Sequence, residues 1–224
     1  MSGLLSGLSR VLQALSLSLF LLPIACSAEQ APAKPADSYK TGEHYIELTA
    51  PVQSEAPPGQ VEILEFFLYT CPHCYHFEPV IGPWSQKLPG NVVFRRVPAN
   101  FGPSAPLYAR AHYAAESLGV LDKVRPVLFK AIHDERRTVD NEAALAKVFQ
   151  EAAGIDEKTF KEAFSSFAVD NQVRKSDALT RAYTITGVPA LAVAGKYVIS
   201  PRNGGTFENM LNIADALATR EKVN

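Results

Sequence analysis

Cysteine is scarce in this chain, which has three among 224 residues, and two of them, Cys71 and Cys74, form a single C-x-x-C motif. A small scaffold held together by several disulfides is therefore excluded. The chain also lacks an excess of positive or negative charge. It contains 22 lysines and arginines and 23 aspartates and glutamates, so its formal net charge is −1. The sequence has no basic stripe, so we do not expect nucleic acid as a partner. It has no nucleotide-binding or metal-binding motif either, so we expect no cofactor beyond the cysteines themselves.

The sequence has only one long apolar run, and this run lies near the N-terminus. Arg10 is the only charge among the first 28 residues, and an almost wholly apolar run covers residues 11–25. Small residues follow up to Ala28. This pattern predicts a secretory signal peptide over residues 1–28, which would deliver the protein to an oxidising compartment. The alternative is a membrane anchor, but the run is shorter than the ~20 residues that a spanning helix needs.

Cys26, the third cysteine, lies at the end of this run and has two interpretations. Residues 22–26 partly match a bacterial lipoprotein processing site, although Pro23 lies where that pattern usually has leucine. Lipidation of Cys26 would anchor the protein to a membrane. In the other interpretation Cys26 belongs to the signal peptide and is discarded with it, which would leave the protein free.

The remaining chain separates into strand-like and helical parts. With 47% hydrophobic residues it can bury one full core and an inserted subdomain. Residues 29–43, rich in proline and alanine, predict a flexible tail. Strand-like runs follow at residues 44–48, 61–69, 92–97, 190–193 and 196–199. We therefore predict an α/β domain over residues 44–102 and 184–224, interrupted by an all-helical insertion over residues 103–183, which has helical stripes only.

Single residues refine two of the expected helices. Pro79 and Pro83 lie inside the helical pattern of residues 75–88, so a kink or a break is expected there. In the insertion, Asp140 is placed to cap the start of a helix that Gly154 stops.

The C-x-x-C motif carries the chemistry. The apolar run over residues 61–69 predicts a buried strand, and a helix is expected to begin directly after it, with Pro72 in its first turn. Cys71 would then lie at the helix N-terminus, where free N–H groups and the helix dipole lower the pKa of a thiol. Cys74 would lie about one turn further along and be less exposed. One attacking and one resolving sulfur predict redox chemistry.

A zinc site is the main alternative for these cysteines. Structural zinc needs four nitrogen or sulfur ligands, and the chain has no second C-x-x-C motif. A site made of both cysteines with His73 and His76 within one turn would be strained. We therefore prefer a redox pair and predict no metal site, and we interpret His76 as a solvated residue of the helix surface.

Further segments accompany the motif in a fixed order: Glu65-Phe66-Phe67, Phe77-Glu78, Gly187-Val188-Pro189-Ala190 and Gly195-Lys196-Tyr197. Together with Cys-Pro-His-Cys they resemble the DsbA family of periplasmic thiol–disulfide oxidoreductases, within the thioredoxin-like superfamily. The similarity extends from Tyr45 to the C-terminus. It implies an α/β, thioredoxin-like fold with an inserted all-helical subdomain. The long N-terminal tail and Leu68-Tyr69-Thr70 before the motif depart from the family pattern.

The resemblance also implies roles for residues around the cysteines. His73 lies between the two cysteines, so its position alone allows it to donate a hydrogen bond to the Cys71 thiolate or to carry a positive charge beside it; otherwise it is an ordinary residue at a helix start. The Val188–Pro189 bond is implied to be cis and to face the disulfide, with the backbone of Val188 binding an extended substrate strand and Gly187 leaving space beside it. The alternative is an ordinary loop-to-strand turn.

Glu65 is an acid within an apolar strand. Because an unpaired buried charge is strongly destabilising, we expect a partner, either Arg95 or Arg96 on the neighbouring strand. This pairing could be structural only, or Glu65 could manage a proton as Cys74 ionises or leaves. Glu78, on the helix after the motif, is either an electrostatic modulator or a surface acid.

The predicted function is a periplasmic protein-disulfide oxidase with a Cys71–Cys74 disulfide as its only redox group. We expect reduced secreted polypeptides as clients, a monomeric state and, by resemblance, a DsbB-type membrane quinone oxidoreductase that restores the disulfide. The alternatives are a disulfide reductase or isomerase of the same fold and a peptide-binding chaperone without redox turnover. Isomerases of related families carry an added dimerisation domain, for which we expect no room ahead of Tyr45.

Overall fold

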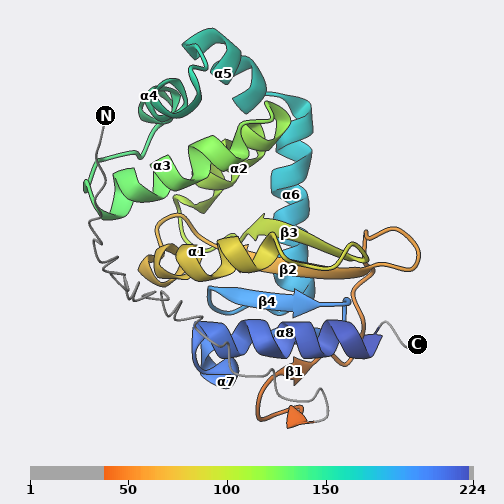
Figure 1. Cartoon of the computed structure of the whole chain (residues 1–224). Coiled ribbons are helices and arrows are strands. Elements are labelled where there is room, and N and C mark those ends of the chain that lie inside the picture. The colour runs from red at the N-terminus through yellow and green to blue at the C-terminus, as the bar shows by residue number, and fades with distance from the viewer. Residues whose placement is uncertain (1–37, 222–224) are drawn as a thin grey trace, which may run out of the picture. The chain divides into compact units, whose positions relative to one another are not determined.

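The computed structural model describes residues 38–221, and its sheet is built around strand β2 (Val61–Phe67), whose seven residues are all buried. The other strands are β1 (Ile46–Glu47), β3 (Val92–Pro98), β4 (Ala190–Val193) and β5 (Tyr197–Ile199). Figure 1 shows the sheet, whose strand order is β1-β5-β4-β2-β3. β2 pairs in parallel with β3 and antiparallel with β4, so the two halves of the predicted α/β domain form one sheet.

The predicted strands agree with the observed ones, and β1 lies at the sheet edge, paired with β5. β2 ends at Phe67, two residues earlier than expected. The reason is a turn at Leu68, whose carbonyl oxygen accepts a hydrogen bond from the N–H of Cys71 (3.2 Å). This turn takes the chain directly from the strand to the helix that follows it.

Side chains of β2 alternate between two faces of the sheet. On one face Ile63 packs with Phe77 of helix α1 (Pro72–Ser85) and with Ile213 of helix α8 (Phe207–Glu221). The two helices therefore cover this face, and α7 (Pro201–Gly204) leads into the second of them. Burial on this side holds α1 directly against the strand that precedes it.

The opposite face of the sheet is covered by the end of the helical insertion. Leu64 and Phe66 of β2 pack there with Tyr183, and the rings of Phe66 and Tyr183 lie 5.4 Å apart. β2 is thus buried on both sides, which explains why its residues other than Glu62 and Glu65 are apolar on both faces rather than on one.

Five helices follow one another between β3 and β4, as predicted for an all-helical insertion. They are α2 (Ala105–Ser117), α3 (Leu121–His133), α4 (Glu142–Ala153), α5 (Glu157–Phe164) and α6 (Phe167–Ala182). In Figure 1, α2 to α5 gather in the upper part of the picture, and α6 returns the chain toward the sheet. Their core contains the paired rings of Phe149 and Phe160, 4.6 Å apart. The α/β fold class with a helical insertion is therefore confirmed.

The predicted cap of α4 is wrong by one residue. Asn141, not Asp140, precedes the helix, and its side chain accepts a hydrogen bond from the N–H of Ala144. An asparagine caps as well as an aspartate, so composition alone does not separate the two neighbours. Gly154 ends the helix in the left-handed conformation (φ 70°), as expected.

Helix α1 continues through both of its internal prolines. The sequence predicts a kink or a break at Pro79 and Pro83, and the structure has one uninterrupted helix over Pro72–Ser85. Both prolines are exposed, so carbonyl groups that lose a partner there can be hydrated. Phe77 and Ile81, fully buried on the other side, hold the helix against the sheet.

Part of the predicted flexible tail packs against the core. Tyr39, within the predicted flexible tail of residues 29–43, is only 4% exposed and belongs to the core cluster that contains α8. The ring of Tyr39 buries a large apolar area. A prediction of disorder from the proline and alanine content of the segment does not take the burial of a single aromatic ring into account. The predicted signal peptide over residues 1–28 and Cys26 lie outside the described residues.

The described residues belong to one compact unit. The predicted boundaries at residues 103 and 183 therefore mark where the helical insertion interrupts the α/β domain along the chain, and they do not separate two compact units. They stay a prediction of where the insertion begins and ends. β3 ends at Pro98 and β4 begins at Ala190, and both lie outside the predicted insertion.

The turn between β4 and β5 depends on a glycine. Gly195 has φ +71°, and its carbonyl oxygen accepts a hydrogen bond from the N–H of Val52 (2.8 Å). A Cβ atom at Gly195 would lie 2.0 Å from the carbonyl oxygen of Val52. The segment before β2 therefore packs against this turn so closely that a side chain is excluded.

Gly195→Ala is expected to lower the free energy of unfolding by about 2–4 kcal/mol, because it adds a backbone clash to the cost of a positive φ. Gly42→Ala is the matched control, since Gly42 also has a positive φ (+79°) but nothing within 4 Å of its Cβ position. It should lose only about 1–2 kcal/mol. Urea unfolding measures the free energy of unfolding of both variants. Equal losses in the two variants would contradict the expected clash, because they would show that the backbone at Val52 moves away from the new Cβ atom.

Candidate active site

The two cysteines lie where β2 passes into α1. Cys71 is the residue before the helix and has an extended backbone (φ −87°, ψ 117°), and Pro72 is the first helical residue. Proline is suited to this position because its missing N–H would have no partner in the first turn. Pro72 and His73 are exposed, and Cys71 is partly exposed. The helix start is therefore open to a reactant.

The surroundings of Cys71 lower its pKa to about 6. The largest cause is the thiol of Cys74, which donates a hydrogen bond to the Cys71 sulfur. The backbone N–H groups of Cys74 and His73 and the charge of His73 act in the same direction, while partial burial opposes them. Cys71 is therefore a thiolate in a large share of molecules at neutral pH.

Cys74 lies in the opposite environment. It is fully buried, and burial raises the pKa of its thiol; the hydrogen bond that it donates to Cys71 and the negative charge of Glu65 add to this effect. Both cysteines are free thiols in the structure. The pair consists of one accessible thiolate and one protected thiol, which is the arrangement that thiol–disulfide exchange needs.

A second segment reaches the redox pair from far along the chain. The Cys71 thiol donates to the carbonyl oxygen of Val188, with the sulfur and oxygen 3.6 Å apart, and the Val188–Pro189 peptide bond is cis. Val188 is half-buried and Gly187 is exposed. A Cβ at Gly187 would meet no atom within 4 Å, so the protein itself does not require a glycine there.

Glu65 is fully buried and paired with Arg96, whose Nε donates to Oε2 of Glu65 at 3.0 Å. Arg95 instead binds Glu62, at 2.5 Å. The register explains the choice that the sequence leaves open, because Glu65 lies opposite Arg96 and shares its face of the sheet. Burial raises the pKa of Glu65, and the arginines that face it oppose this shift.

Arg125 of α3 is a residue of this site that sequence reasoning misses. Its Nη2 lies 3.4 Å from Oε2 of Glu65 and 2.5 Å from Oε1 of Glu78, and its Nε donates to Oε2 of Glu78 at 2.9 Å. Glu78, predicted as a modulator or a surface acid, is therefore tied into the same cluster. One feature of the sequence could have indicated that Arg125 is buried. It lies three and four residues before the apolar Leu128 and Phe129, and so on the face of the helix that packs inward.

Aromatic and histidine side chains of the insertion surround the turn before Cys71. The Tyr69 hydroxyl is hydrogen-bonded to Nδ1 of His112 (3.2 Å), and Nε2 of His133 donates to the Tyr69 carbonyl oxygen (2.8 Å). His133 also stacks on Tyr75, with ring centres 5.0 Å apart. The insertion thus supports the redox turn through several contacts, none of which a local sequence pattern reveals. His76 is exposed, as predicted.

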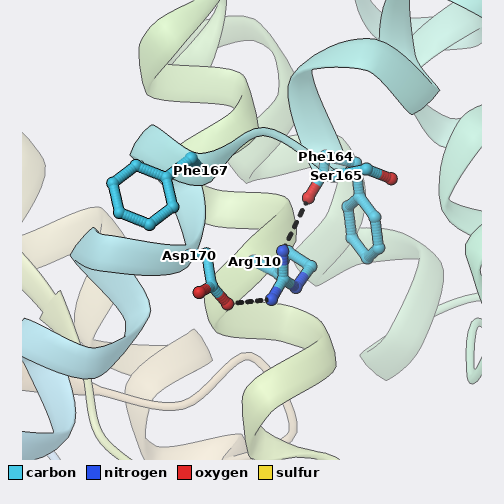
Figure 2. Close-up of a pocket in the computed structure, with 5 residues that line it drawn as sticks. All are labelled: Arg110, Phe164, Ser165, Phe167 and Asp170. Atoms are coloured by element: carbon cyan, nitrogen blue, oxygen red, sulfur yellow. Dashed lines mark hydrogen bonds and ion pairs between the residues drawn. The ribbon is translucent and has the colours of Figure 1, made fainter.

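A cavity of about 380 Å³ lies elsewhere, on the insertion, and Figure 2 shows the five residues that line it. They are Arg110, Phe164, Ser165, Phe167 and Asp170. Arg110 already donates to the Phe164 carbonyl oxygen and to Asp170, as the dashed lines mark. None of the predicted site residues lines this cavity.

Within residues 38–221 no group of three or more histidine, cysteine or acidic side chains could hold a metal ion. In the same part of the chain no helix is both long and apolar enough to cross a membrane.

Comparisons with known proteins agree with this geometry. The family described as DSBA-like thioredoxin domain matches residues 91–212. The thiol:disulfide interchange protein DsbA of Pseudomonas aeruginosa is 40% identical over 190 residues, which cover 85% of this chain and 89% of that protein. DsbA of Azotobacter vinelandii is 40% identical over 198 residues, covering 88% and 91%.

Solved structures are similar over the same extent. The crystal structure of Pseudomonas aeruginosa DsbA has a TM-score of 0.80 and 39% identity, and the match covers 85% of this chain and 98% of that one. The oxidoreductase NmDsbA1 from Neisseria meningitidis has a TM-score of 0.72 at 26% identity, covering 84% and 96%. The predicted thioredoxin-like fold and the predicted family are both confirmed. This chain belongs to the DsbA family of periplasmic thiol:disulfide oxidoreductases.

Proposed function

We propose that this protein oxidises reduced secreted polypeptides in the periplasm with a disulfide between Cys71 and Cys74. The observation that carries the proposal is the inequality of the two sulfurs, since the pKa of Cys71 is lowered to about 6 and that of Cys74 is raised. A stabilised Cys71 thiolate favours the reduced protein and therefore makes the disulfide easy to donate.

The reaction consists of two exchanges at sulfur. A client thiolate attacks Sγ of Cys71, the Cys71–Cys74 bond breaks, and Cys74 leaves with the electron pair and is protonated, which balances the proton that the client thiol lost on ionising. A second client thiolate then attacks the client sulfur of the mixed disulfide and releases Cys71 as a thiolate. The client loses two electrons and gains a disulfide, and the protein is left as the dithiol.

The segment around the cis peptide bond is proposed to bind the client. A backbone carbonyl 3.6 Å from the attacked sulfur, at Val188, is placed to pair with an extended peptide. Pro189, which follows, is buried, and the exposed Gly187 keeps side chains away from an incoming chain. Main-chain recognition of this kind accepts clients of varied sequence.

Regeneration and location complete the proposal. A DsbB-type membrane quinone oxidoreductase would take the two electrons from the dithiol, and a monomer suffices for both half-reactions. Cys26 is either lipidated or removed with the signal peptide. The intact mass of the mature protein distinguishes these outcomes.

Cys71→Ala is expected to abolish oxidative refolding of a reduced, disulfide-containing client, because no sulfur is left for the client to attack. Cys74→Ala should still react when Cys71 is supplied as a mixed disulfide, but it cannot form the intramolecular bond. Refolding yield and non-reducing gel electrophoresis measure both effects. Full activity of Cys71→Ala would favour the chaperone alternative instead.

His73→Leu is expected to raise the pKa of Cys71 by about one pH unit, because it removes a positive charge from beside the thiolate. The rate of alkylation by iodoacetamide against pH measures this midpoint, which should lie at about 6 in the unchanged protein. His76→Leu is the control, because His76 is exposed on the same helix one turn further from Cys71. An unchanged midpoint in His73→Leu would assign the lowered pKa to the hydrogen bonds alone.

Stability of the reduced protein should depend on pH through the same thiol. The folded state lowers the pKa of Cys71 to about 6, below its ordinary value of about 8.5 in an unfolded chain. The resulting stabilisation is fully present above about pH 8.5 and is lost as pH falls through about 6. Differential scanning calorimetry should therefore show that the Tm of the reduced protein falls on acidification relative to the Tm of the oxidised protein. It should also fall relative to the Tm of Cys71→Ala, which has no thiol at this position and cannot form the disulfide.

A further inference from the structure

Four charged side chains form a cluster behind the redox pair, composed of Glu65 on β2, Arg96 on β3, Glu78 on α1 and Arg125 on α3. Two carboxylates face two guanidinium groups, so the cluster carries no net charge when all four are ionised. The cluster is largely enclosed, since Glu65 is fully buried and the side chains of Arg125, Arg96 and Glu78 are 3%, 17% and 21% exposed.

Arg125 is the member of the cluster that touches both acids. Its Nη2 reaches Glu65 at 3.4 Å and Glu78 at 2.5 Å, whereas Arg96 is paired with Glu65. The guanidinium also lies over the ring of Phe67, with Cζ 3.9 Å from the ring centre. Among the described residues its Nη1 has no hydrogen-bond partner.

Such an arrangement is a poor way to stabilise a core. A buried ion pair can often be replaced by apolar side chains without loss of stability, and an unpaired Nη1 adds a further desolvation cost. Arg125 is contributed by the insertion, while both of its acidic partners belong to the elements that hold the cysteines. Its position therefore suggests a role in the reaction rather than in folding alone.

The acids of the cluster belong to the two elements that meet at the cysteines. Glu78 follows Cys74 by one turn of α1, and Glu65 lies on the strand that leads into Cys71. The negative charge of Glu65 raises the pKa of Cys74, so the two groups interact. Without Arg125 the two carboxylates would have only one compensating charge in the cluster, that of Arg96.

We propose that Arg125 is a positioning residue of the redox centre, which keeps the buried cluster neutral and thereby allows negative charge to form on the sulfurs when the disulfide opens. The proposal deepens the proposed function and depends on it. When a client thiolate attacks Cys71, the electron pair of the broken S–S bond passes to Cys74. An uncompensated carboxylate nearby would oppose this charge and the Cys71 thiolate that follows.

The test is the equilibrium of the Cys71/Cys74 couple with reduced and oxidised glutathione at about pH 8. Arg125→Met, which removes the charge and keeps an apolar stem, should shift this equilibrium toward the disulfide by about threefold to tenfold, as expected for one unit charge at intermediate dielectric. The alkylation midpoint of Cys71 should rise with it. Arg125→Lys retains the charge and should remain within about twofold of the unchanged protein.

The double variant Arg125→Met/Glu65→Gln separates an electrostatic role from a structural one. It removes one charge of each sign, so the cluster is again neutral, and the equilibrium should return to within about twofold of the unchanged protein. If Arg125→Met alone is too unstable to study, this double variant carries the test, because it should fold and match the unchanged protein. A double variant that stays unfolded or shifted overturns the proposal.

Arg95→Met is the matched control. It also breaks an arginine pair with a buried acid of β2, but Glu62 lies on the other face of the sheet from Glu65. It should lower stability without moving the glutathione equilibrium. An equal shift in Arg95→Met, or none in a folded Arg125→Met, contradicts the role of Arg125. Failure of the proposed function is distinguishable, because the unchanged protein itself would then fail to oxidise a reduced client.

Discussion

Two sulfurs three residues apart are held in opposite environments, and the rest of the structure serves this difference. Cys71 lies at an exposed helix start among N–H donors, whereas Cys74 is enclosed by the core. The difference persists only if α1 begins at a fixed place, and β2, buried on both faces, provides that place. Val188 then closes the site from the other half of the sheet. A mobile helix start would average the two environments and remove the difference between the two sulfurs.

The helical insertion is part of this arrangement and not an independent module. Through His133 it holds the carbonyl of Tyr69, and through Arg125 it reaches the acids behind the cysteines. Buried charges of this kind need complete compensation, because each is costly in a medium of low dielectric. The packing of α3 against β2 and α1 is consequently coupled to the electrostatics of the cysteine pair. A substitution that changes this packing is therefore expected to change the pKa values of the cysteines.

Local patterns were sufficient where the physical cause is local. The buried run of β2, the proline at the start of α1 and the glycine that ends α4 were all predicted from neighbouring residues. The predictions failed where the outcome depends on burial elsewhere. The break expected in α1 at Pro79 or Pro83 does not occur, because the inner face of the helix is packed, and Tyr39 of the predicted tail is buried in the cluster that contains α8.

The sequence by itself determined the C-x-x-C motif, the order of the elements and the family, since these depend on residue types a few positions apart and on a resemblance that extends along the chain. Tertiary structure alone decided which arginine faces Glu65, because strand register selects Arg96 over Arg95. It also decided that Arg125 completes the buried charge cluster. Such pairings join residues that are 31 and 60 positions apart, and no local spacing encodes them. They follow from the way in which buried charges must find partners once the chain has folded.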